Sequence, residues 1–228
     1  MEKDLNFINL IRDRHSIRNY ARYTLTDIDK AHIVETVAGA VPLDSGIHLD
    51  WKIADAAPMG GSGLLYAECG TSGEELVEYG YRGEQSVLRL TAEGWGTCWY
   101  GMAHMPGSPC SIVFGKPGTP GVRTAVLGVL SRGHTRKSLE QLVTGGIPAD
   151  SSPLVRTVVE SARLAPSAMN RQTWTFEVAS DTQVVIRGGI GRFPDLGICL
   201  ANAMVTARQL AGAATVIRLD SGEYSVSW

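Results

Sequence analysis

The feature that most constrains the fold of this chain is a pattern of helix, proline and strand that occurs twice. Apolar residues at helical spacing follow Thr26 and stop at Pro42, and a second such stretch follows Ser152 and stops at Pro166. Proline cannot continue a helix, so each proline marks a helix end. A strand opened by a tryptophan is expected after each, at 51–54 and 174–178. The repeat indicates two diverged tandem halves.

A second correspondence supports the duplication. Each half contains a predicted long helix with an acidic residue, a glycine two positions later, an amide five positions after that, and a glycine at its end. These positions are Glu78, Gly80, Gln85 and Gly94 in the first half, and Asp195, Gly197, Asn202 and Gly212 in the second. Accidental matching of alternating helices and strands is the alternative explanation. The halves are expected at 1–143 and 153–228, with a linker of small and polar residues at 144–152.

The other expected elements come from local pattern. They are a short helix at 4–13, a Gly- and Met-rich loop at 59–63, a strand at 64–68, a helix at 72–93 that could break near 80–83, an extended segment at 97–102, a loop at 106–120, a strand at 124–130, and a short helix at 137–143 capped near Thr135. On the helix after Thr26, the expected apolar face includes Ile28, Ile33, Val34 and Val37.

The composition excludes several classes of protein. Hydrophobic residues are 44%, charged residues 19% and the net charge −2, which favours a folded soluble protein and gives no basic excess for nucleic acid. No apolar run reaches the roughly 20 residues that span a membrane. The N-terminus lacks a secretory pattern and the four cysteines form no CxxC pair, so we expect a cytoplasmic protein without disulfides or a metal site.

A cluster of basic residues follows the first helix. Arg14, His15, Ser16 and Arg18 bring three potential cations and a hydroxyl within five residues. Guanidinium groups suit phosphate oxygens, because two parallel N–H bonds match their geometry. A solvated charged turn is the alternative interpretation.

A loop of small and amide-bearing residues follows the second helix end, from Ala165 to Trp174. Such a narrow loop could lie against a flat heterocycle, with the amides of Asn170 and Gln172 bonded to the polar edge of the ring. The alternative is a turn in which Asn and Ser side chains bond to the loop's own backbone.

Four segments together resemble the nitroreductase family of flavoenzymes. They are Arg14–Tyr20, the run from Glu78 to Gly101 with its Gly94-Trp95-Gly96 turn, Arg136–Leu139, and Ala165–Trp174. One departure is Thr173, which stands where the family usually has proline. The resemblance implies an α+β fold with a central antiparallel or mixed sheet flanked by helices. It also implies flavin mononucleotide (FMN) bound at an interface between two subunits.

In this chain the family's binding elements are divided between the halves. The basic opening occurs only in the first half and the intact Pro-Ser loop only in the second. The resemblance therefore implies a single-chain pseudo-dimer with one FMN, either monomeric or a homodimer. The second half, with about 75 residues, is expected to be too short to reproduce a full subunit.

The resemblance also implies roles for individual residues. It places Arg14, Ser16 and, beside them, His15 at the ribityl-phosphate arm, Arg18 at the pyrimidine side, and Gly101 next to Tyr100 near flavin N5. It assigns a second basic pair to His134 and Arg136, and the lining of the isoalloxazine to Pro166, Ser167 and Asn170. No acid or base side chain is required, because the flavin carries the redox chemistry.

The leading hypothesis is an FMN-dependent oxidoreductase that passes hydride from NAD(P)H to a small acceptor such as a nitroaromatic or a quinone. One alternative is a non-catalytic flavin-binding or flavin-storage protein of the same fold. Another is a structural relic that has lost both flavin sites. No nucleic-acid or membrane partner is expected.

Overall fold

The computed structural model of this chain describes residues 5–55, 57–102, 105–119, 135–189, 191 and 193–228. The predicted strand at 124–130 and His134 lie outside these residues. The first part contains α1 (Phe7–Asp13), α2 (Asp27–Ala38), β1 (Trp51–Ala54), the 3-10 turn η2 (Pro58–Gly60), β2 (Gly63–Ala67), α3 (Gly73–Ala92), β3 (Gly96–Tyr100) and β4 (Ser111–Gly115). The second contains α5 (Leu139–Leu142), α6 (Pro153–Arg163), the 3-10 turn η3 (Ala168–Asn170), β5 (Thr175–Ser180), β6 (Gln183–Arg187), α7 (Phe193–Ala211), β7 (Thr215–Arg218) and β8 (Tyr224–Ser227).

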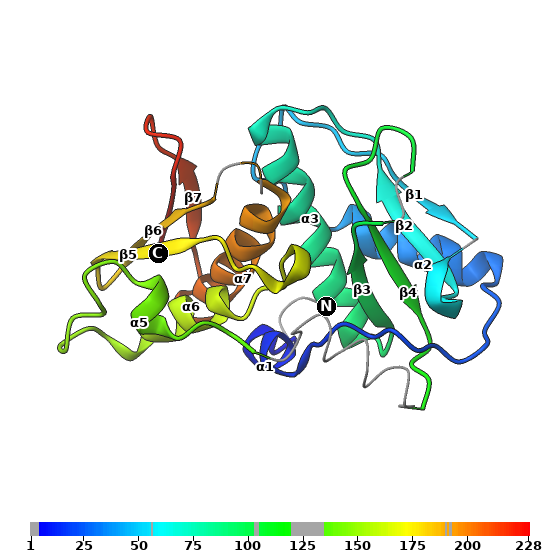
Figure 1. Cartoon of the computed structure of the whole chain (residues 1–228), viewed down its shortest axis with the longest axis horizontal. Helices are drawn as coiled ribbons and strands as arrows, with labels where there is room; N and C mark the ends of the chain where they lie inside the picture. Colours follow the sequence, from blue (N-terminus) through cyan, green and yellow to red (C-terminus); the bar gives the residue numbers. More distant parts are fainter. Residues whose placement is uncertain (1–4, 56, 103–104, 120–134, 190, 192) are drawn as a thin grey trace.

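The strands form two separate four-stranded antiparallel sheets, in the orders β1-β2-β4-β3 and β5-β6-β8-β7. In both sheets the four strands lie side by side in the same order: the first strand in the chain, then the second, the fourth and the third. A long helix, α3 or α7, joins the second strand to the third in each case. Figure 1 shows the two sheets on opposite sides of the molecule, with α3 and α7 between them. The expected α+β class is confirmed, and the second half, although short, contains the same succession of α-helices and β-strands as the first, with only its 3-10 turn in a different place.

The helices begin where the sequence supplies capping side chains. Thr26 and Asp29 form a reciprocal capping box at the start of α2, and Ser72 and Glu75 form another at α3. Ser152 caps α6 with Pro153 in its first turn, as predicted. The capping residue of the short helix α5 is Ser138 rather than one near Thr135, because the backbone N–H of Ser138 donates to the side chain of Gln141.

The apolar face predicted for α2 is only half correct. Ile33 and Val37 are buried, whereas Ile28 and Val34 are 82% and 45% exposed. Helix α2 covers the sheet at one edge of the molecule, so a narrow stripe of its surface meets the core (Figure 1).

Helices α3 and α7 pack closely along one another, and glycines allow the approach. A Cβ atom added to Gly80 would lie 2.0 Å from the carbonyl oxygen of Pro194, and one added to Gly197 would lie 2.0 Å from that of Val77. The predicted break near 80–83 is therefore wrong: α3 is continuous, and Gly80 serves close packing between helices.

Each sheet has its own apolar core. One core combines the second sheet, α6 and α7 with Val77 and Tyr81 of α3, and the other combines the first sheet with α2 and α3. Trp99 packs against both cores. The side chain of Trp99 thus lies where the two halves meet.

Sequence reasoning missed four strands. The predicted loop at 106–120 contains β4, which pairs with β2 on one side and β3 on the other, so that Ile112, Val113 and Phe114 are fully buried. Strands β6, β7 and β8 were also not predicted, although turn residues mark two of their boundaries: Asp181 before β6, and Asp220-Ser221-Gly222 between β7 and β8. Among the described residues, no helix is both long and apolar enough to cross a membrane.

Candidate functional site

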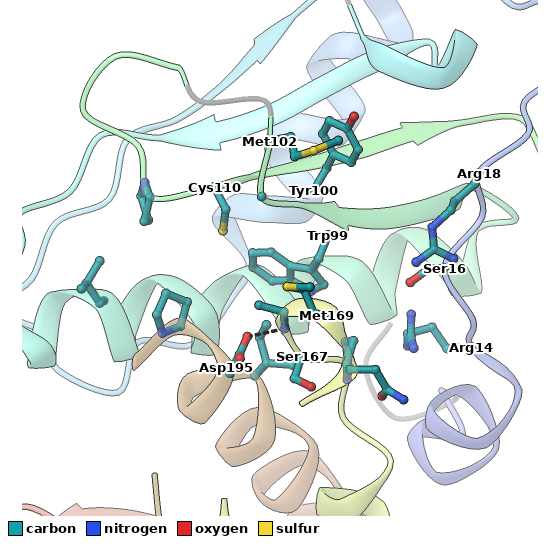
Figure 2. Close-up of a pocket in the computed structure, with 18 of the residues that line it drawn as sticks. Arg14, Ser16, Arg18, Trp99, Tyr100, Met102, Cys110, Ser167, Met169 and Asp195 are labelled. Atoms are coloured by element: carbon teal, nitrogen blue, oxygen red, sulfur yellow. Dashed lines mark hydrogen bonds between the residues drawn. The ribbon is translucent and has the colours of Figure 1, made fainter. Parts of the chain in front are cut away.

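A cavity of about 580 Å³ lies between the two halves. Its lining comes from the turn after α1, the start of α3, the end of β3, the segments before β4 and α5, the loop after α6 and the start of α7. Figure 2 shows Arg14, Ser16 and Arg18 along one side, Trp99 at the centre, and Ser167, Met169 and Asp195 on the opposite side from Tyr100 and Met102. Segments far apart in the sequence therefore line the same cavity.

The basic opening segment reaches the cavity because it runs along β3. The backbone N–H of Ile17 donates to the carbonyl of Thr97 at 2.9 Å. The Ile17 side chain lies against Gly96, where a Cβ atom would come within 3.0 Å of it. Arg14 follows the last residue of α1 and is buried. This attachment directs Arg14, Ser16 and Arg18 into the cavity.

The loop after α6 is held by hydrogen bonds from both its ends. The backbone N–H of Ala168 donates to Asp195 Oδ1 at 3.0 Å, and that of Gln172 donates to Ser167 Oγ at 2.9 Å. Met169, Asn170 and Gln172 have φ values of 53°, 53° and 49°, a left-handed conformation that costs a residue with a Cβ atom free energy. The loop is therefore strained, and its contacts keep it in place.

Arg136 connects the loop to the helix that precedes it. Its guanidinium group donates to the carbonyl of Leu164 at 3.2 Å and to Asn170 Oδ1 at 3.0 Å. Burial, followed by the charges of Arg14 and Arg163, lowers the pKa of Arg136 to about 10. The positive charges of Arg14 and Arg136 therefore repel one another, and an anion between them would relieve the repulsion.

Nine of the twelve predicted site residues line the cavity: Arg14, Ser16, Arg18, Tyr100, Gly101, Arg136, Pro166, Ser167 and Asn170. His15 is exposed and lines a neighbouring hollow of about 320 Å³ with Arg12 and Asp13. His134 lies outside the described residues.

Gln172 is not part of the lining, because its polar groups bind the protein itself. It is buried, its Oε1 accepts from the N–H of Lys137 at 2.8 Å, and its Nε2 donates to the carbonyl of Asn170 at 3.1 Å. The Asn170 amide is similarly engaged, with Nδ2 donating to Thr135 O at 2.7 Å and Oδ1 accepting from Arg136. The self-bonded turn therefore describes Ser167, whose Oγ accepts from the loop's own backbone, whereas the two amides bind mainly the segment 135–137.

Several residues of the cavity were not among the twelve predicted site residues. Trp99, Met102, Met169 and Asp195 all line it. A signal existed for Asp195, which occupies the acidic position that the two long helices share. Glu78, at the same position in α3, likewise accepts from backbone N–H groups in the loop after α2, at 3.0 Å from both Leu43 and Asp44. The same relationship thus occurs in both halves.

The arrangement suits a planar ligand that carries negative charge. Three guanidinium groups lie in the lining, and Trp99, Tyr100, Ile198 and the two methionines supply apolar surface. Cys110 also lines the cavity, but burial raises the pKa of its thiol to about 12, so it stays protonated and is no nucleophile at neutral pH.

The chain matches a protein-family model described as "Putative TM nitroreductase" over residues 6–207. It is similar to the crystal structure of a nitroreductase-like protein from Thermotoga maritima, with 30% identity and a TM-score of 0.80 over 98% of this chain and 94% of that one. A nitroreductase-like protein from Desulfovibrio desulfuricans in complex with FMN shares 16% identity, with a TM-score of 0.47 over 64% of this chain and 99% of that one. An FMN-bound nitroreductase from Desulfitobacterium hafniense shares 13%, with a TM-score of 0.43 over 51% and 92%. A search of curated proteins gives no significant match.

Proposed function

This chain belongs to the nitroreductase family, and from that premise we propose that it binds one FMN in the cavity between its halves and uses it as an oxidoreductase. In this proposal hydride passes from NAD(P)H through the flavin to a small acceptor such as a nitroaromatic or a quinone. The observation that carries it is that Arg14 from the first half and Ser167 from the second half line the same cavity.

The residues present fit FMN in size and chemistry. A volume of about 580 Å³ is within the range of small-molecule sites, which span roughly 300–1,000 Å³. Arg14 and Arg136 would hold the phosphate, because their charges lie close together and guanidinium groups match phosphate oxygens. Arg18 would lie at the pyrimidine side of the ring, where a cation favours negative charge.

The apolar walls of the cavity would contact the flavin ring. Pro166 and Ser167 would contact the ring from the second half, and Trp99 lines the cavity at the centre of the view in Figure 2. Bound FMN would supply hydride transfer, so the protein's own part is to orient the ring, neutralise charge and exclude water. A Cβ atom added to Gly101 would meet no atom within 4 Å, so this position leaves room for a close approach.

We also propose that a single chain is sufficient for binding. Both the basic side and the loop side of the cavity come from this chain, and the sheets share one strand order, as a fused pseudo-dimer requires. Light scattering at the concentrations used for flavin titration tests this. A site that fills only in a dimer would contradict it.

The first test is an absorption spectrum of the purified protein, followed by titration with FMN. We expect a flavin band and one FMN per chain. The variant Arg18→Ala should weaken binding by roughly tenfold or more, as loss of a charge-assisted contact implies. Arg22→Ala is the matched control, because Arg22 lies four residues further on, is exposed and is outside the cavity lining.

The second test separates catalysis from storage. Rapid mixing of the FMN-loaded protein with NADH or NADPH should bleach the flavin band, and a nitroaromatic or a quinone should restore it. A yellow protein that neither reductant bleaches would support the storage alternative and refute the enzyme. A protein that binds no FMN would refute both.

A further inference from the structure

A buried carboxyl group, Glu84 on α3, lies beneath the cavity without lining it. Its side chain is fully buried, and the groups that contact it do line the cavity. Trp99 Nε1 donates to Glu84 Oε2 at 2.7 Å. The Nε atom of Arg14 lies 3.9 Å from Oε1, and this second oxygen accepts no hydrogen bond from the described residues.

Two opposing effects set the protonation of Glu84. Burial raises its pKa to about 7, while Arg14, the Trp99 hydrogen bond and Arg136 lower it from the value that burial alone would give. Glu84 is therefore divided between its two protonation states near neutral pH. A small change in the charge around it will change its proton occupancy.

The charged groups on the other helices that pack against α3 interact with residues other than Glu84. On α7, Asp195 acts on Cys110 and Cys199, and Arg208 acts on Tyr81. On α2, His32 contacts Glu93, beyond the end of α3. On α1, Arg12 and Asp13 line the neighbouring hollow. Within the described part of the chain, Glu84 therefore responds to Arg14 and Arg136, two of the three guanidinium groups of the cavity.

We propose that Glu84 is a positioning residue that takes up a proton when an anionic ligand binds between Arg14 and Arg136. The proposal rests on the proposed function, with the phosphate of FMN as the anion. An anion beside these guanidinium groups opposes their stabilisation of the carboxylate. A proton from solvent then bonds to Oε1, no electrons move, and Oε2 still accepts from Trp99. The indole thus stays in place as the charge of the cavity changes.

The test is calorimetric titration at pH 7 in buffers that differ in ionisation enthalpy, which gives the protons taken up per ligand. For FMN we expect wild type to exceed Glu84→Gln by roughly half a proton. The second pKa of a phosphate monoester is about 6, so at pH 7 the phosphate is mostly dianionic in both proteins and contributes little to the difference. Riboflavin, which lacks the phosphate, should show no such difference. Glu78→Gln is the matched control, because Glu78 is also buried on α3 but does not line the cavity or contact Arg14.

Infrared spectroscopy tests the same proposal on the wild-type protein alone, so the test does not depend on the folding of a variant. In wild type, FMN should increase the absorption of protonated carboxyl near neutral pH, and riboflavin should not. Equal proton uptake in wild type and Glu84→Gln, with FMN bound to both, would overturn this inference and leave the flavin site intact. If FMN does not bind, the proposed function fails. Inorganic phosphate then replaces FMN as the probe, and a carboxyl midpoint that phosphate leaves unchanged would overturn the inference as well.

Discussion

The carboxylate of Asp195 accepts a hydrogen bond from the backbone N–H of Ala168 at 3.0 Å, so the first turn of α7 holds the loop that forms one side of the cavity. Glu78 on α3 does the same for the loop after α2. In the first half this loop lacks the Pro-Ser sequence, and in the second half it lines the cavity. In both halves a carboxylate on the long helix therefore accepts from the backbone of a loop, but only the loop of the second half lines the cavity and has the Pro-Ser sequence.

Asp195→Ala should loosen the loop after α6. Loss of a buried charged acceptor costs roughly 1–3 kcal/mol of unfolding free energy, and we expect FMN affinity to fall by about tenfold. Urea unfolding and flavin fluorescence measure the two effects. Asp220→Ala, an exposed site in the turn before β8, is the control. Equal behaviour of the two variants would show that the loop does not depend on Asp195.

Gly197→Ala should destabilise the protein although alanine favours helices by about 1 kcal/mol. The added Cβ would lie 2.0 Å from the carbonyl oxygen of Val77, so α3 and α7 would have to separate. Overpacking of this kind costs roughly 1–3 kcal/mol. Gly101→Ala, which meets no atom within 4 Å, should leave the melting temperature unchanged. A stable Gly197→Ala protein would mean that the helices have room to adjust.

At position 169, glycine should be more stabilising than alanine, the reverse of the usual order. Met169 has a φ of 53°, and a Cβ atom in this region costs roughly 1–2 kcal/mol that glycine avoids. Thermal unfolding of Met169→Gly and Met169→Ala tests this. The same pair at Met102, which is similarly exposed but has no positive φ, should not favour glycine. If glycine were more stabilising than alanine at both positions, the positive φ of Met169 would not be the cause.

Glu84 should make the free energy of unfolding fall as the pH rises from about 4.5 to about 7. Burial raises the pKa of Glu84 to about 7, so in this interval the folded state binds more protons than the unfolded state. The contribution is roughly 3 kcal/mol, present at low pH and lost above neutrality. Glu84→Gln should remove it.

Urea unfolding of wild type and Glu84→Gln at pH 5 and pH 8 measures that contribution. We expect Glu84→Gln to gain on wild type at the higher pH, because glutamine stays uncharged. Lys52 and Glu68, an exposed pair at 2.9 Å, offer the control: Glu68→Gln should show no comparable dependence on pH. A constant difference between wild type and Glu84→Gln would refute the assignment.

Local patterns in the sequence were sufficient for the helices and for the components of the site. Capping residues such as Thr26, Ser72 and Ser152 mark helix starts because a side-chain oxygen bonds to the N–H groups nearby, an interaction within four residues. Arg14, Arg18 and the Pro166–Ser167 pair were recognisable by residue type and by resemblance. That they share a cavity is a relationship between distant segments, and the resemblance predicted it.

Other features depend on distances that no local pattern contains. Gly80 looked like a helix break, and only the carbonyl of Pro194 beside it shows why glycine is needed there. Gln172 looked like a ligand contact, but Lys137 and Asn170 take its amide. The charge of Glu84 depends on burial and on Arg14, 70 positions away in the chain. Capping and spacing act between neighbours along the chain, so the amino-acid sequence alone determined the helices and only some of the strands. Close packing, amide partners and pKa values act between neighbours in space, so they followed from the folded structure.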